Sequence, residues 1–433
     1  MQQIRVYPAT GPQVDVWADS PSYADVAAAV ATSSPGDVVG VPAGDGTETW
    51  ASTLTLTRGI HLYGPGRGNL TITVDGIVAI SFAPNSTALT NDETIRITGF
   101  TFDGSDNTHA DGLIAVDGGN YINVWTGLRI GDCRFTNVSA TAIYPWGQNR
   151  GVIYNNLFDR CRYPIRVQGG DNVNIWTALG GSREFGSLDN LYFEDNTITY
   201  SSTPVGSGPG WTETGQCARM VSRYNTWDMT NCDDDEFWDV HGFQDPQTGT
   251  LVTEFYGNTL TTVSPQRWVY FRGGWGLCFN NVATGGGSMS INLRDYTGCC
   301  DSVSGVPGQI DNCYFWNNAF NGTEQPAVID GSACGDNPLV ELTKVYNLNT
   351  AFDGTTEHGV GRGTSVPGVS CTNVPTTDLN DQPIRGDAYW VASTATPTVD
   401  KTITQAGRLY KYIGGSWQVY YAPFDYPHPG RTL

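Results

Sequence analysis

Asparagine recurs at one position of a repeated short-strand pattern, and this recurrence restricts the fold more than any other feature. Each asparagine stands two residues before an apolar residue, where one alternating segment gives way to the next. In the frame that Cys133 opens, the steps are 23 to 40 residues and the asparagines are Asn156, Asn196, Asn225, Asn258, Asn281 and Asn318. Self-similarity at this period is typical of a solenoid, whose equivalent positions stack about 4.8 Å apart. Stacked asparagines can bond one another and the turn backbone, and asparagine tolerates the left-handed conformation expected at such a turn.

A second column is formed by residues that end a strand pattern, usually just before a glycine. In the later turns this frame predicts an outward-facing column of His241, Arg272 and Arg294. Two residues earlier, a neighbouring outward column contains Asp239, Tyr270 and Asn292. The corresponding positions of earlier turns are Trp146, Arg166 and Gln168. These columns are the candidate functional surface, because the apolar residues between them are expected to point into the core.

The charge balance excludes some partners. The chain has 433 residues, 23 of them Lys or Arg and 43 Asp or Glu, which gives a net charge of −20. Such an acidic surface repels nucleic acid and anionic lipid at long range, so we expect no nucleic-acid partner. Without an apolar run of about 18 residues, membrane insertion is not expected. The start lacks the charged head and apolar core of a signal peptide, so either the chain avoids that export route or a leader was removed.

The cysteines predict disulfides but no zinc site. None of the ten cysteines forms a pair of CxxC motifs at zinc spacing, so we expect no structural metal. No cofactor is required by any motif, although the acidic composition makes bound Ca²⁺ possible. Cys217 and Cys232 flank one predicted turn, and several cysteines are expected to be disulfide-bonded outside a reducing cytoplasm. The alternative is that the strand cysteines Cys133, Cys278 and Cys313 are buried thiols.

The N-terminal segment carries a family resemblance. A helix is predicted over residues 22–33, capped by Ser20 or Ser22, with one face formed by Tyr23, Val26, Ala27 and Val30. Residues 36–44 then read Gly-Asp-Val-Val-Gly-Val-Pro-Ala-Gly. A short helix followed by Gly-Asp-x-Val-x-x-Pro-Ala-Gly resembles the entry to the parallel β-helix of the pectate lyase-like superfamily. The resemblance implies an all-β chain folded as a right-handed parallel β-helix, with the helix capping its open end.

This fold and the local composition predict four parts. They are an N-terminal cap with the entry strand (1–45), the parallel β-helix (46–352), a linker (353–383) and a C-terminal β-hairpin module (384–433). The hairpin is expected from residues 408–413 and 416–421 around Gly414-Gly415. Excursions from the coil are expected at 169–190 and 201–216, where Trp176 and Trp211 lie in segments rich in Gly, Ser or Pro.

The resemblance also implies an enzymatic alternative. Proteins of this superfamily often cleave acidic polysaccharides, and elimination requires a cation, a base and an acid. The candidate catalytic residues are His241, Asp239, Arg272, Glu254, Arg294, Tyr270 and Arg223. Hydrolysis would use two carboxylates about 5–9.5 Å apart, for which Asp239 and Glu254 are the candidate pair. Candidate substrate-binding residues are Trp146, Gln168, Arg166, Trp176, Trp211 and Asn292.

Two further hypotheses compete with catalysis. Asp239, Arg272 and Arg294 could form an ion-pair ladder that has no function beyond stability. A binding protein is the third possibility, because the chain contains 13 Trp, 21 Tyr and 16 Phe, and aromatic rings stack on sugars. In architecture the chain looks like a bacteriophage tail spike, fibre or capsid decoration protein. This implies an extracellular or virion-associated protein that binds surface polysaccharide, as a possible homotrimer or docked to other virion proteins through its C-terminal module. We favour this hypothesis, with a polysaccharide lyase or glycoside hydrolase as the alternative.

Overall fold

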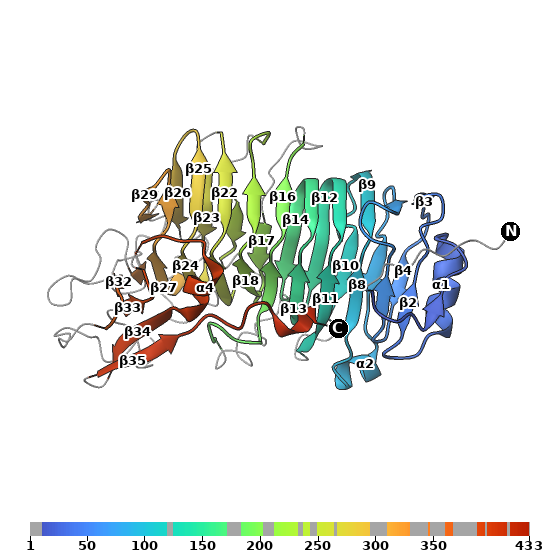
Figure 1. The fold of residues 1–433 in the computed structure, drawn as a ribbon, viewed down its shortest axis with the longest axis horizontal. Coiled ribbons are helices and arrows are strands. Elements are labelled where there is room, and N and C mark those ends of the chain that lie inside the picture. Colours follow the sequence, from blue (N-terminus) through green and yellow to red (C-terminus); the bar gives the residue numbers. More distant parts are fainter. Residues whose placement is uncertain are drawn as a thin grey trace. The chain divides into compact units, whose positions relative to one another are not determined.

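Parallel strands dominate the computed structural model, which is a right-handed parallel β-helix as the resemblance implied (Figure 1). It describes residues 11–118, 124–170, 183–201, 212–232, 237–242, 249–263, 266–294, 310–329, 345–346, 360–366, 388–394, 396–413 and 416–432. The chain divides into two compact units. The first unit comprises Met1–Val167, Leu191–Thr212 and His428–Leu433. The second unit comprises Gln168–Asn190 and Glu213–Pro427.

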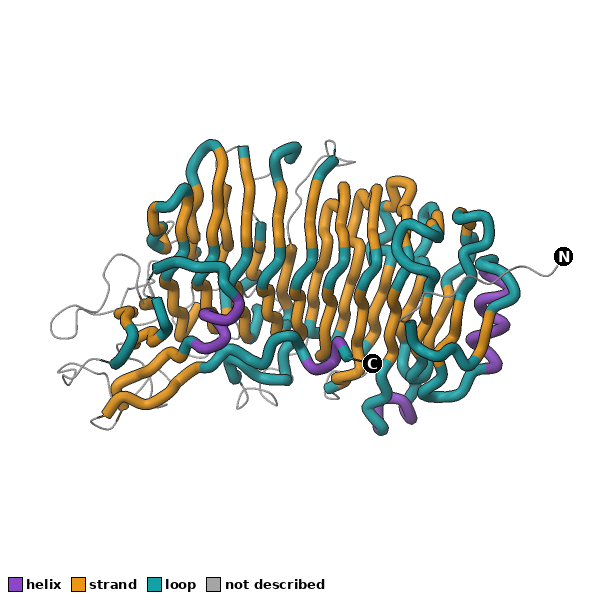
Figure 2. The backbone as a smooth tube through the Cα atoms, in the orientation of Figure 1, coloured by secondary structure: helices purple, strands orange, loops and turns teal. Residues whose placement is uncertain are grey.

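Successive turns of the first unit stack strand upon strand (Figure 2). One sheet contains β1 (Val16–Trp17), β2 (Val38–Gly40), β5 (His61–Tyr63), β8 (Ile95–Thr98), β11 (Trp125–Gly131), β13 (Asn149–Tyr154) and β15 (Leu191–Glu194). The other contains β3 (Thr47–Thr49), β4 (Leu54–Leu56), β6 (Thr71–Thr73), β7 (Ile80–Phe82), β9 (Thr101–Asn107), β10 (Ile114–Asp117), β12 (Arg134–Trp146), β14 (Leu157–Gln168) and β16 (Thr197–Thr199). Inside the coil, Phe102, Phe135 and Phe158 stack ring on ring, with centroids 5.6 and 5.1 Å apart.

The second unit repeats this arrangement. One sheet contains β18 (Arg219–Arg223), β21 (Val252–Tyr256), β24 (Gly274–Phe279), β27 (Ile310–Trp316) and β31 (Val345–Tyr346). The other contains β17 (Thr212–Gly215), β19 (Thr226–Asp228), β20 (Trp238–Val240), β22 (Thr259–Thr262), β23 (Gln266–Phe271), β25 (Val282–Gly285), β26 (Met289–Leu293), β28 (Ala319–Phe320), β29 (Thr323–Glu324) and β30 (Ala327–Ile329). A smaller sheet contains β32 (Val360–Gly363), β33 (Ala388–Val391), β34 (Arg408–Ile413) and β35 (Ser416–Tyr421), and α4 is Lys401–Ala406. Strands β34 and β35 pair antiparallel, which confirms the C-terminal hairpin.

The predicted N-terminal cap is helix α1 (Tyr23–Thr32). Ser22 is the N-cap and accepts a hydrogen bond from Asp25 N at 3.2 Å. The helix buries Val26, Ala29 and Val30, so Ala29 takes the core position expected for Ala27. The described part of the first unit also contains helix α2 (Ser86–Thr90) and the 3-10 turn η1 (Pro429–Arg431).

The ladder asparagines lie at the bends that follow strands β13, β15, β18, β21, β24 and β27. In the second unit, Asn225 N and Nδ2 donate to Asn258 Oδ1 at 3.0 and 3.1 Å. Asn258 donates in the same way to Asn281, and the side chain of Asn281 donates to Asn318 Oδ1 at 2.8 Å. All four are buried. Each amide oxygen therefore satisfies a backbone N–H of the previous turn, as the sequence predicted.

The first unit continues the same pattern from Cys133. Cys133 N donates to Asn156 Oδ1 and Asn156 N to Asn196 Oδ1, at 3.0 and 2.9 Å. The left-handed conformation, however, is not adopted by the ladder asparagines. It falls on the residue before each asparagine, namely Asn155, Asp195, Tyr224, Gly257, Asn280 and Asn317, and on Asp132 before Cys133. At Gly257 a β-carbon would lie 2.6 Å from the Tyr224 ring, so only glycine fits there.

The described cysteines are thiols, not disulfides. Their six positions are Cys133, Cys161, Cys217, Cys232, Cys278 and Cys313, and all are buried. The expected disulfides are therefore wrong for Cys217 and Cys232, and the alternative of buried thiols holds. Burial raises the pKa of Cys133 to about 12, which keeps its sulfur protonated. The remaining four cysteines lie outside the described residues.

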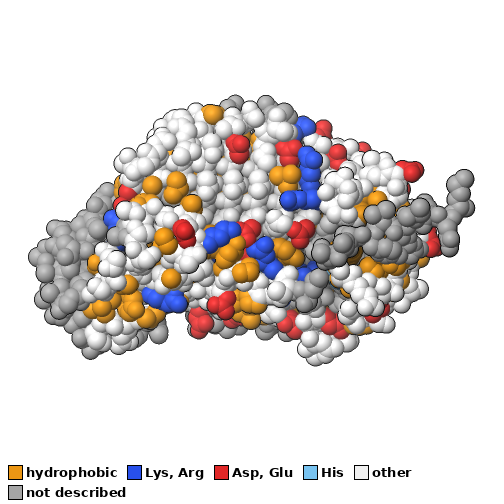
Figure 3. Space-filling view, in the orientation of Figure 1, with side chains coloured by type: hydrophobic (Ala, Val, Ile, Leu, Met, Phe, Trp, Pro, Cys, Tyr) orange, Lys and Arg blue, Asp and Glu red, His pale blue; other side chains and the backbone are white. Residues whose placement is uncertain are grey.

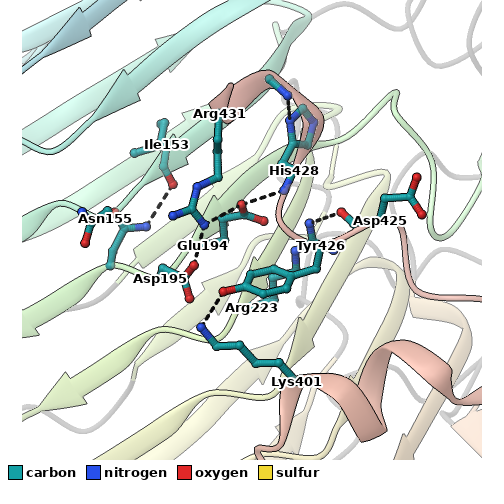
Figure 4. A network of polar contacts seen from close by, with 12 residues as sticks. Ile153, Asn155, Glu194, Asp195, Arg223, Lys401, Asp425, Tyr426, His428 and Arg431 are labelled. Atoms are coloured by element: carbon teal, nitrogen blue, oxygen red, sulfur yellow. Dashed lines mark hydrogen bonds and ion pairs between the residues drawn. The ribbon is translucent and has the colours of Figure 1, made fainter. Parts of the chain in front are cut away.

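Residues near the C-terminus bond charged side chains of the unit to which each belongs (Figure 4). In the second unit, Arg223 donates to the carbonyls of Phe424 and Asp425 at 2.6 and 2.7 Å. In the first unit, His428 N and Arg431 both donate to Glu194 Oε1, at 3.0 and 3.1 Å. In the middle of the face that Figure 3 shows, several basic side chains have acidic ones near them. Among the described residues, no helix is long and apolar enough to cross a membrane.

Removing one asparagine of the ladder is expected to destabilise the protein. Asn258→Ala leaves the backbone and side-chain N–H groups of Asn225 buried without their acceptor. Since each unsatisfied buried group costs about 1–3 kcal/mol, the free energy of unfolding should fall by about 2–4 kcal/mol. Urea unfolding would measure the change. The matched control is Asn69→Ala, because Asn69 is exposed and should change stability by less than about 0.5 kcal/mol. Equal stability of the two variants would contradict a structural role for the ladder.

Candidate functional site

The outer face of strands β20, β23 and β26 carries the predicted outward column of Asp239, Tyr270 and Asn292. These strands pair in parallel, which places Asp239 opposite Tyr270 and Tyr270 opposite Asn292. The residues that follow, Val240 and Phe271, are fully buried and pair with each other. The alternation therefore has the phase that the sequence indicated, with polar side chains directed out of the coil.

The second column continues the same register beyond the strand ends. Arg272 N donates to Val240 O at 2.9 Å, and Arg294 N donates to Phe271 O at 2.8 Å. These bonds place His241, Arg272 and Arg294 at equivalent positions of successive turns, as predicted. A β-carbon at Gly242 would lie 2.1 Å from the Arg272 carbonyl oxygen. The glycine after His241 is therefore required by the close approach of the next turn.

Glu213 is a member of the site that the sequence interpretation missed. His241 N donates to Thr214 O at 2.8 Å, so β17 precedes β20 in the stack and brings Glu213 beside Asp239. A β-carbon at Gly215 would lie 3.3 Å from His241 Cβ, which shows that His241 sits directly over this glycine. The composition of residues 201–216 predicts an excursion there, but the structure places residues 212–215 in β17. Their Thr-Glu-Thr-Gly alternation, ending in glycine like Asp-Val-His-Gly, is the signal that could have identified the strand.

Two carboxylates, an imidazole and a guanidinium converge here, and we call these four residues the Glu213 cluster: Glu213, Asp239, His241 and Arg272. His241 Nε2 lies 3.0 Å from Asp239 Oδ2 and 3.5 Å from Glu213 Oε1. Because both oxygens contact the same nitrogen, they are at most about 6.5 Å apart. Arg272 Nε donates to Asp239 Oδ1 at 2.9 Å, and Arg272 Nη2 also contacts Asp239 Oδ2.

The cluster is desolvated except at the histidine. The side chains of Glu213, Asp239 and Arg272 are 8%, 5% and 9% exposed, whereas that of His241 is 23% exposed. Burial alone would raise the pKa of Asp239. Hydrogen bonds and charge from His241 and Arg272 outweigh burial and hold this pKa below its usual value. Asp239 is therefore a buried anion that the cluster stabilises.

The contacts of His241 Nε2 admit both neutral tautomers of the ring. With its proton on Nε2, His241 can donate to Asp239 Oδ2. With its proton on Nδ1, Nε2 can accept from Arg272 Nη2 at 2.8 Å, because a guanidinium only donates. In the first tautomer the lone pair is on Nδ1, which is then the basic atom of the ring.

Cationic and aromatic side chains adjoin the cluster. Arg272 Cζ lies 5.1 Å and Arg267 Cζ 4.4 Å from the centroid of the Tyr270 ring. Arg294 is exposed, and its Nη1 donates to Tyr270 Oη at 3.4 Å. The Tyr270 hydroxyl and the Arg294 guanidinium therefore form a polar edge that solvent or a ligand can reach.

Glu254 and Arg223 do not join this cluster, contrary to the prediction. Both belong to the other sheet, on β21 and β18, and both are fully buried. Glu254 accepts hydrogen bonds from Tyr421 Oη at 2.7 Å and from Gly186 N at 2.6 Å. Arg223 bonds the chain carbonyls near Phe424. Their side chains do point out of the coil, but the C-terminal segment covers them, so they serve packing of the second unit.

The predicted substrate-binding residues have different environments. Trp146 and Arg166 are partly exposed on the first unit, and Asn292 is partly exposed on the second. Gln168 is buried, with 7% exposure, at the end of β14. Trp176 and Trp211 lie outside the described residues. Within the described part of the chain, no group of three or more His, Cys, Asp or Glu side chains could hold a metal ion.

Comparisons with known proteins give resemblances to solved structures only. No protein-family model and no curated protein sequence matches the chain. The A-module of mannuronan C-5 epimerase AlgE4 from Azotobacter vinelandii is 14% identical with a TM-score of 0.32, covering 71% of this chain and 94% of its own. The AlgE6 A-module is 13% identical with a TM-score of 0.35, covering 71% and 92%. The catalytic domain of a GH87 alpha-1,3-glucanase in complex with nigerose is 11% identical with a TM-score of 0.32, covering 76% and 70%. Resemblance at this level assigns no activity and no site residue, and the strand registers above establish the β-helix independently.

Glu254 is expected to make stability depend on pH. Burial raises its pKa to about 7 from 4.5, although Tyr421 and Gly186 bond it. Between these values the folded state keeps a proton that the unfolded chain releases, so the free energy of unfolding should fall as pH rises from 4.5 to 7. The fall amounts to about 3 kcal/mol. Urea unfolding of Glu254→Gln at pH 5 and pH 8 should show a smaller difference than the wild type. An unchanged pH dependence would contradict this assignment.

The two arginines of the second column should differ strongly in their effect on stability. Arg272→Ala leaves Asp239 buried without its bidentate partner and should cost about 3–5 kcal/mol near neutral pH. The matched variant Arg294→Ala removes an exposed guanidinium and should cost less than about 0.5 kcal/mol. Since the pKa of Asp239 is lowered, the stability that Arg272 supplies should be lost as pH falls through the acid range. Thermal unfolding of both variants at pH 7 and at pH 3 would test this ordering.

Proposed function

We propose that this protein acts on an acidic polysaccharide, and that the Glu213 cluster is its proton-transfer site. The observation that carries the proposal is the position of His241. Its Nε2 lies within 3.5 Å of two buried carboxylates, while its ring is partly exposed on the outer face of the sheet. A histidine oriented by buried carboxylates through one nitrogen presents the other nitrogen as a general base.

Elimination next to a sugar carboxylate suits these residues. His241 Nδ1 would remove the proton on the carbon that bears the carboxylate, and this electron pair forms the new C=C bond as the glycosidic C–O bond breaks. The Tyr270 hydroxyl would protonate the departing oxygen, and Tyr270 would regain a proton from the imidazolium through water. Asp239 and Glu213 stabilise the imidazolium that forms, so they are positioning residues. Arg294, exposed beside Tyr270, supplies a cation for the sugar carboxylate.

Hydrolysis is the second candidate, and one observation favours it. The carboxylate oxygens of Glu213 and Asp239 are at most about 6.5 Å apart, an upper limit that is compatible with the separation of about 5–5.5 Å in retaining glycosidases. Glu213 thereby takes the place that the sequence interpretation gave to Glu254. Against hydrolysis, Asp239 is held by Arg272 through both of its oxygens, which favours a supporting role for this carboxylate.

Binding without turnover remains the alternative proposal that the sequence favoured. The bidentate Asp239–Arg272 pair supports it, because such a pair is complete without any substrate. The extracellular or virion location, the homotrimer and docking to other virion proteins stay predictions. Sedimentation of the purified protein and immunolabelling of particles would test them.

Turnover on a panel of acidic and neutral polysaccharides tests the proposal. Ultraviolet absorbance of unsaturated products identifies elimination, and new reducing ends without absorbance identify hydrolysis. We expect His241→Ala and Glu213→Gln to lower kcat by at least about 100-fold, the usual contribution of a general base. The matched control is His109→Ala, because His109 is also a partly exposed histidine beside a carboxylate, 3.9 Å from Asp111. Turnover that survives in both cluster variants would refute the site, and binding without turnover on any substrate would favour the alternative.

A further inference from the structure

Glu254 lies at the centre of a covered patch on the outer face of strands β18, β21 and β24. The strand register places it between Val221 and Leu277, two fully buried apolar residues. Glu254 is itself fully buried. A carboxylate in these surroundings loses the hydration that stabilises its charge, so its ionisation is costly unless an opposite charge is in contact with it.

Residues 183–190 cover this patch and bond Glu254 through two donors. Gly186 N donates to Glu254 Oε1 at 2.6 Å, and Asn190 Nδ2 lies 3.4 Å from the same oxygen. Gly186 has a φ of 63°, and a β-carbon there would lie 2.2 Å from Ala422 O. Residues 183–190 contain turns but neither helix nor strand, so strand pairing does not hold this segment on the coil.

The C-terminal hairpin supplies the third donor to Glu254. Tyr421 Oη, on β35, donates to Glu254 Oε2 at 2.7 Å. The centroid of the Tyr421 ring lies 6.2 Å from that of Phe185, and the Phe185 ring lies 6.0 Å from Trp275 on β24. Residues 183–190 thus contact both the hairpin and the sheet, and all of these elements belong to the second unit.

Two arginines on β18 act on Glu254 through their charge. Arg219 and Arg223 favour the anion, as do the hydrogen bonds from Tyr421 and Gly186. Both guanidinium groups are bonded elsewhere, however. Arg219 Nε lies 3.3 Å from an amide oxygen of the covering segment, and Arg223 donates to two chain carbonyls near β35. Burial outweighs these effects and raises the pKa of Glu254 to about 7.

The charged side chains of the covering elements have other environments. In the segment, Arg183 lies 5.5 Å from a tryptophan ring, Glu184 is exposed and Asp189 is partly exposed. On β34, Lys411 Nζ lies 4.1 Å from a tyrosine ring, and Arg408 donates to carbonyls at the end of α4. The proton on Glu254 is therefore governed by burial, the two arginines of β18 and the donors that bond its oxygens.

We propose that Glu254 is a pH-sensitive latch, which holds residues 183–190 on the coil while it is protonated and releases them when it ionises. The acid can donate from Oε2 to the Tyr421 hydroxyl and accept from Gly186 N at Oε1. The anion is left in a patch without water, and opening of the segment restores its hydration. The latch belongs to a different sheet from the Glu213 cluster, so it does not depend on the proposed function.

The direction of the switch follows from where the proton is held. The pKa of Glu254 is about 7 in the closed state and takes its ordinary value of 4.5 once water reaches the side chain. The closed segment is therefore most stable below pH 4.5 and loses stability as pH rises to 7. Above pH 7 both states are ionised, and no further loss is expected.

Hydrogen exchange of the full chain, read by mass spectrometry and corrected for the intrinsic pH dependence of exchange, tests the latch. Protection of the amides in residues 183–190 should fall at least about tenfold between pH 5 and pH 8, because each pKa unit is a factor of ten. A local opening exposes little surface, so exchange in this segment should respond little to dilute urea. Exchange in β22, which requires unfolding of the coil, should accelerate with urea.

Glu254→Gln keeps a neutral side chain at every pH, so protection of residues 183–190 should change less than about twofold between pH 5 and pH 8. The matched control is Glu48→Gln on β3, a partly exposed glutamate, which should behave like the wild type. Equal protection of the wild-type segment at both pH values would overturn the latch. So would a loss in Glu254→Gln as large as in the wild type.

Two readouts on the wild type keep the test decisive if Glu254→Gln does not fold. A fall in protection between pH 4.5 and pH 7 that stops above pH 7 supports the latch. A fall that continues above pH 7 assigns the opening to another group and overturns it. Exchange of residues 183–190 with the same protection and urea dependence as β22 also overturns it, since the segment would then open only when the coil unfolds.

Discussion

Satisfying the backbone at the bends of the coil is the constraint on which both units depend. A bend interrupts the strand ladder, and a buried N–H left there would cost about as much as a lost hydrogen bond. The ladder asparagines solve this with one side chain per turn, whose oxygen accepts from the backbone of the preceding turn. The same amide donates along the ladder or to a strand carbonyl. One residue type at one position thus fixes the bend and sets the register of the strands that follow.

The register of the paired strands brings residues that are distant in the chain together in one site. Asp239, Tyr270 and Asn292 belong to three different turns of the chain, yet the strand pairing makes successive ones neighbours on one face. The pattern of alternation predicted this face and the second column, because buried Val240 and Phe271 fix its phase. The fold and the columns were therefore accessible from sequence. The ion-pair hypothesis also predicted from the sequence that Asp239 pairs with Arg272.

The sequence did not reveal which segments cover the outer face of each sheet. Period-2 alternation shows that Glu254 and Arg223 leave the coil, but a side chain that leaves the coil need not meet solvent. Tyr421 and the carbonyl of Phe424, distant in sequence, bond these two side chains. Glu213 was missed for the opposite reason. Its strand is only four residues long and follows a long irregular step, so periodicity alone assigned it to an excursion. Coverage is a tertiary property that local patterns do not encode, whereas the short strand left only the Thr-Glu-Thr-Gly alternation as a local signal.

The Glu213 cluster differs from a ladder built for stability alone in one physical respect. A structural ion pair is strongest when each charge is matched, as Arg272 and Asp239 are. Glu213 places a second buried carboxylate within 3.5 Å of His241 Nε2, which a ladder made only of the Asp239–Arg272 pair would not require. The His241 ring is partly exposed, so the cluster directs two buried acids at a side chain that solvent and a ligand can reach.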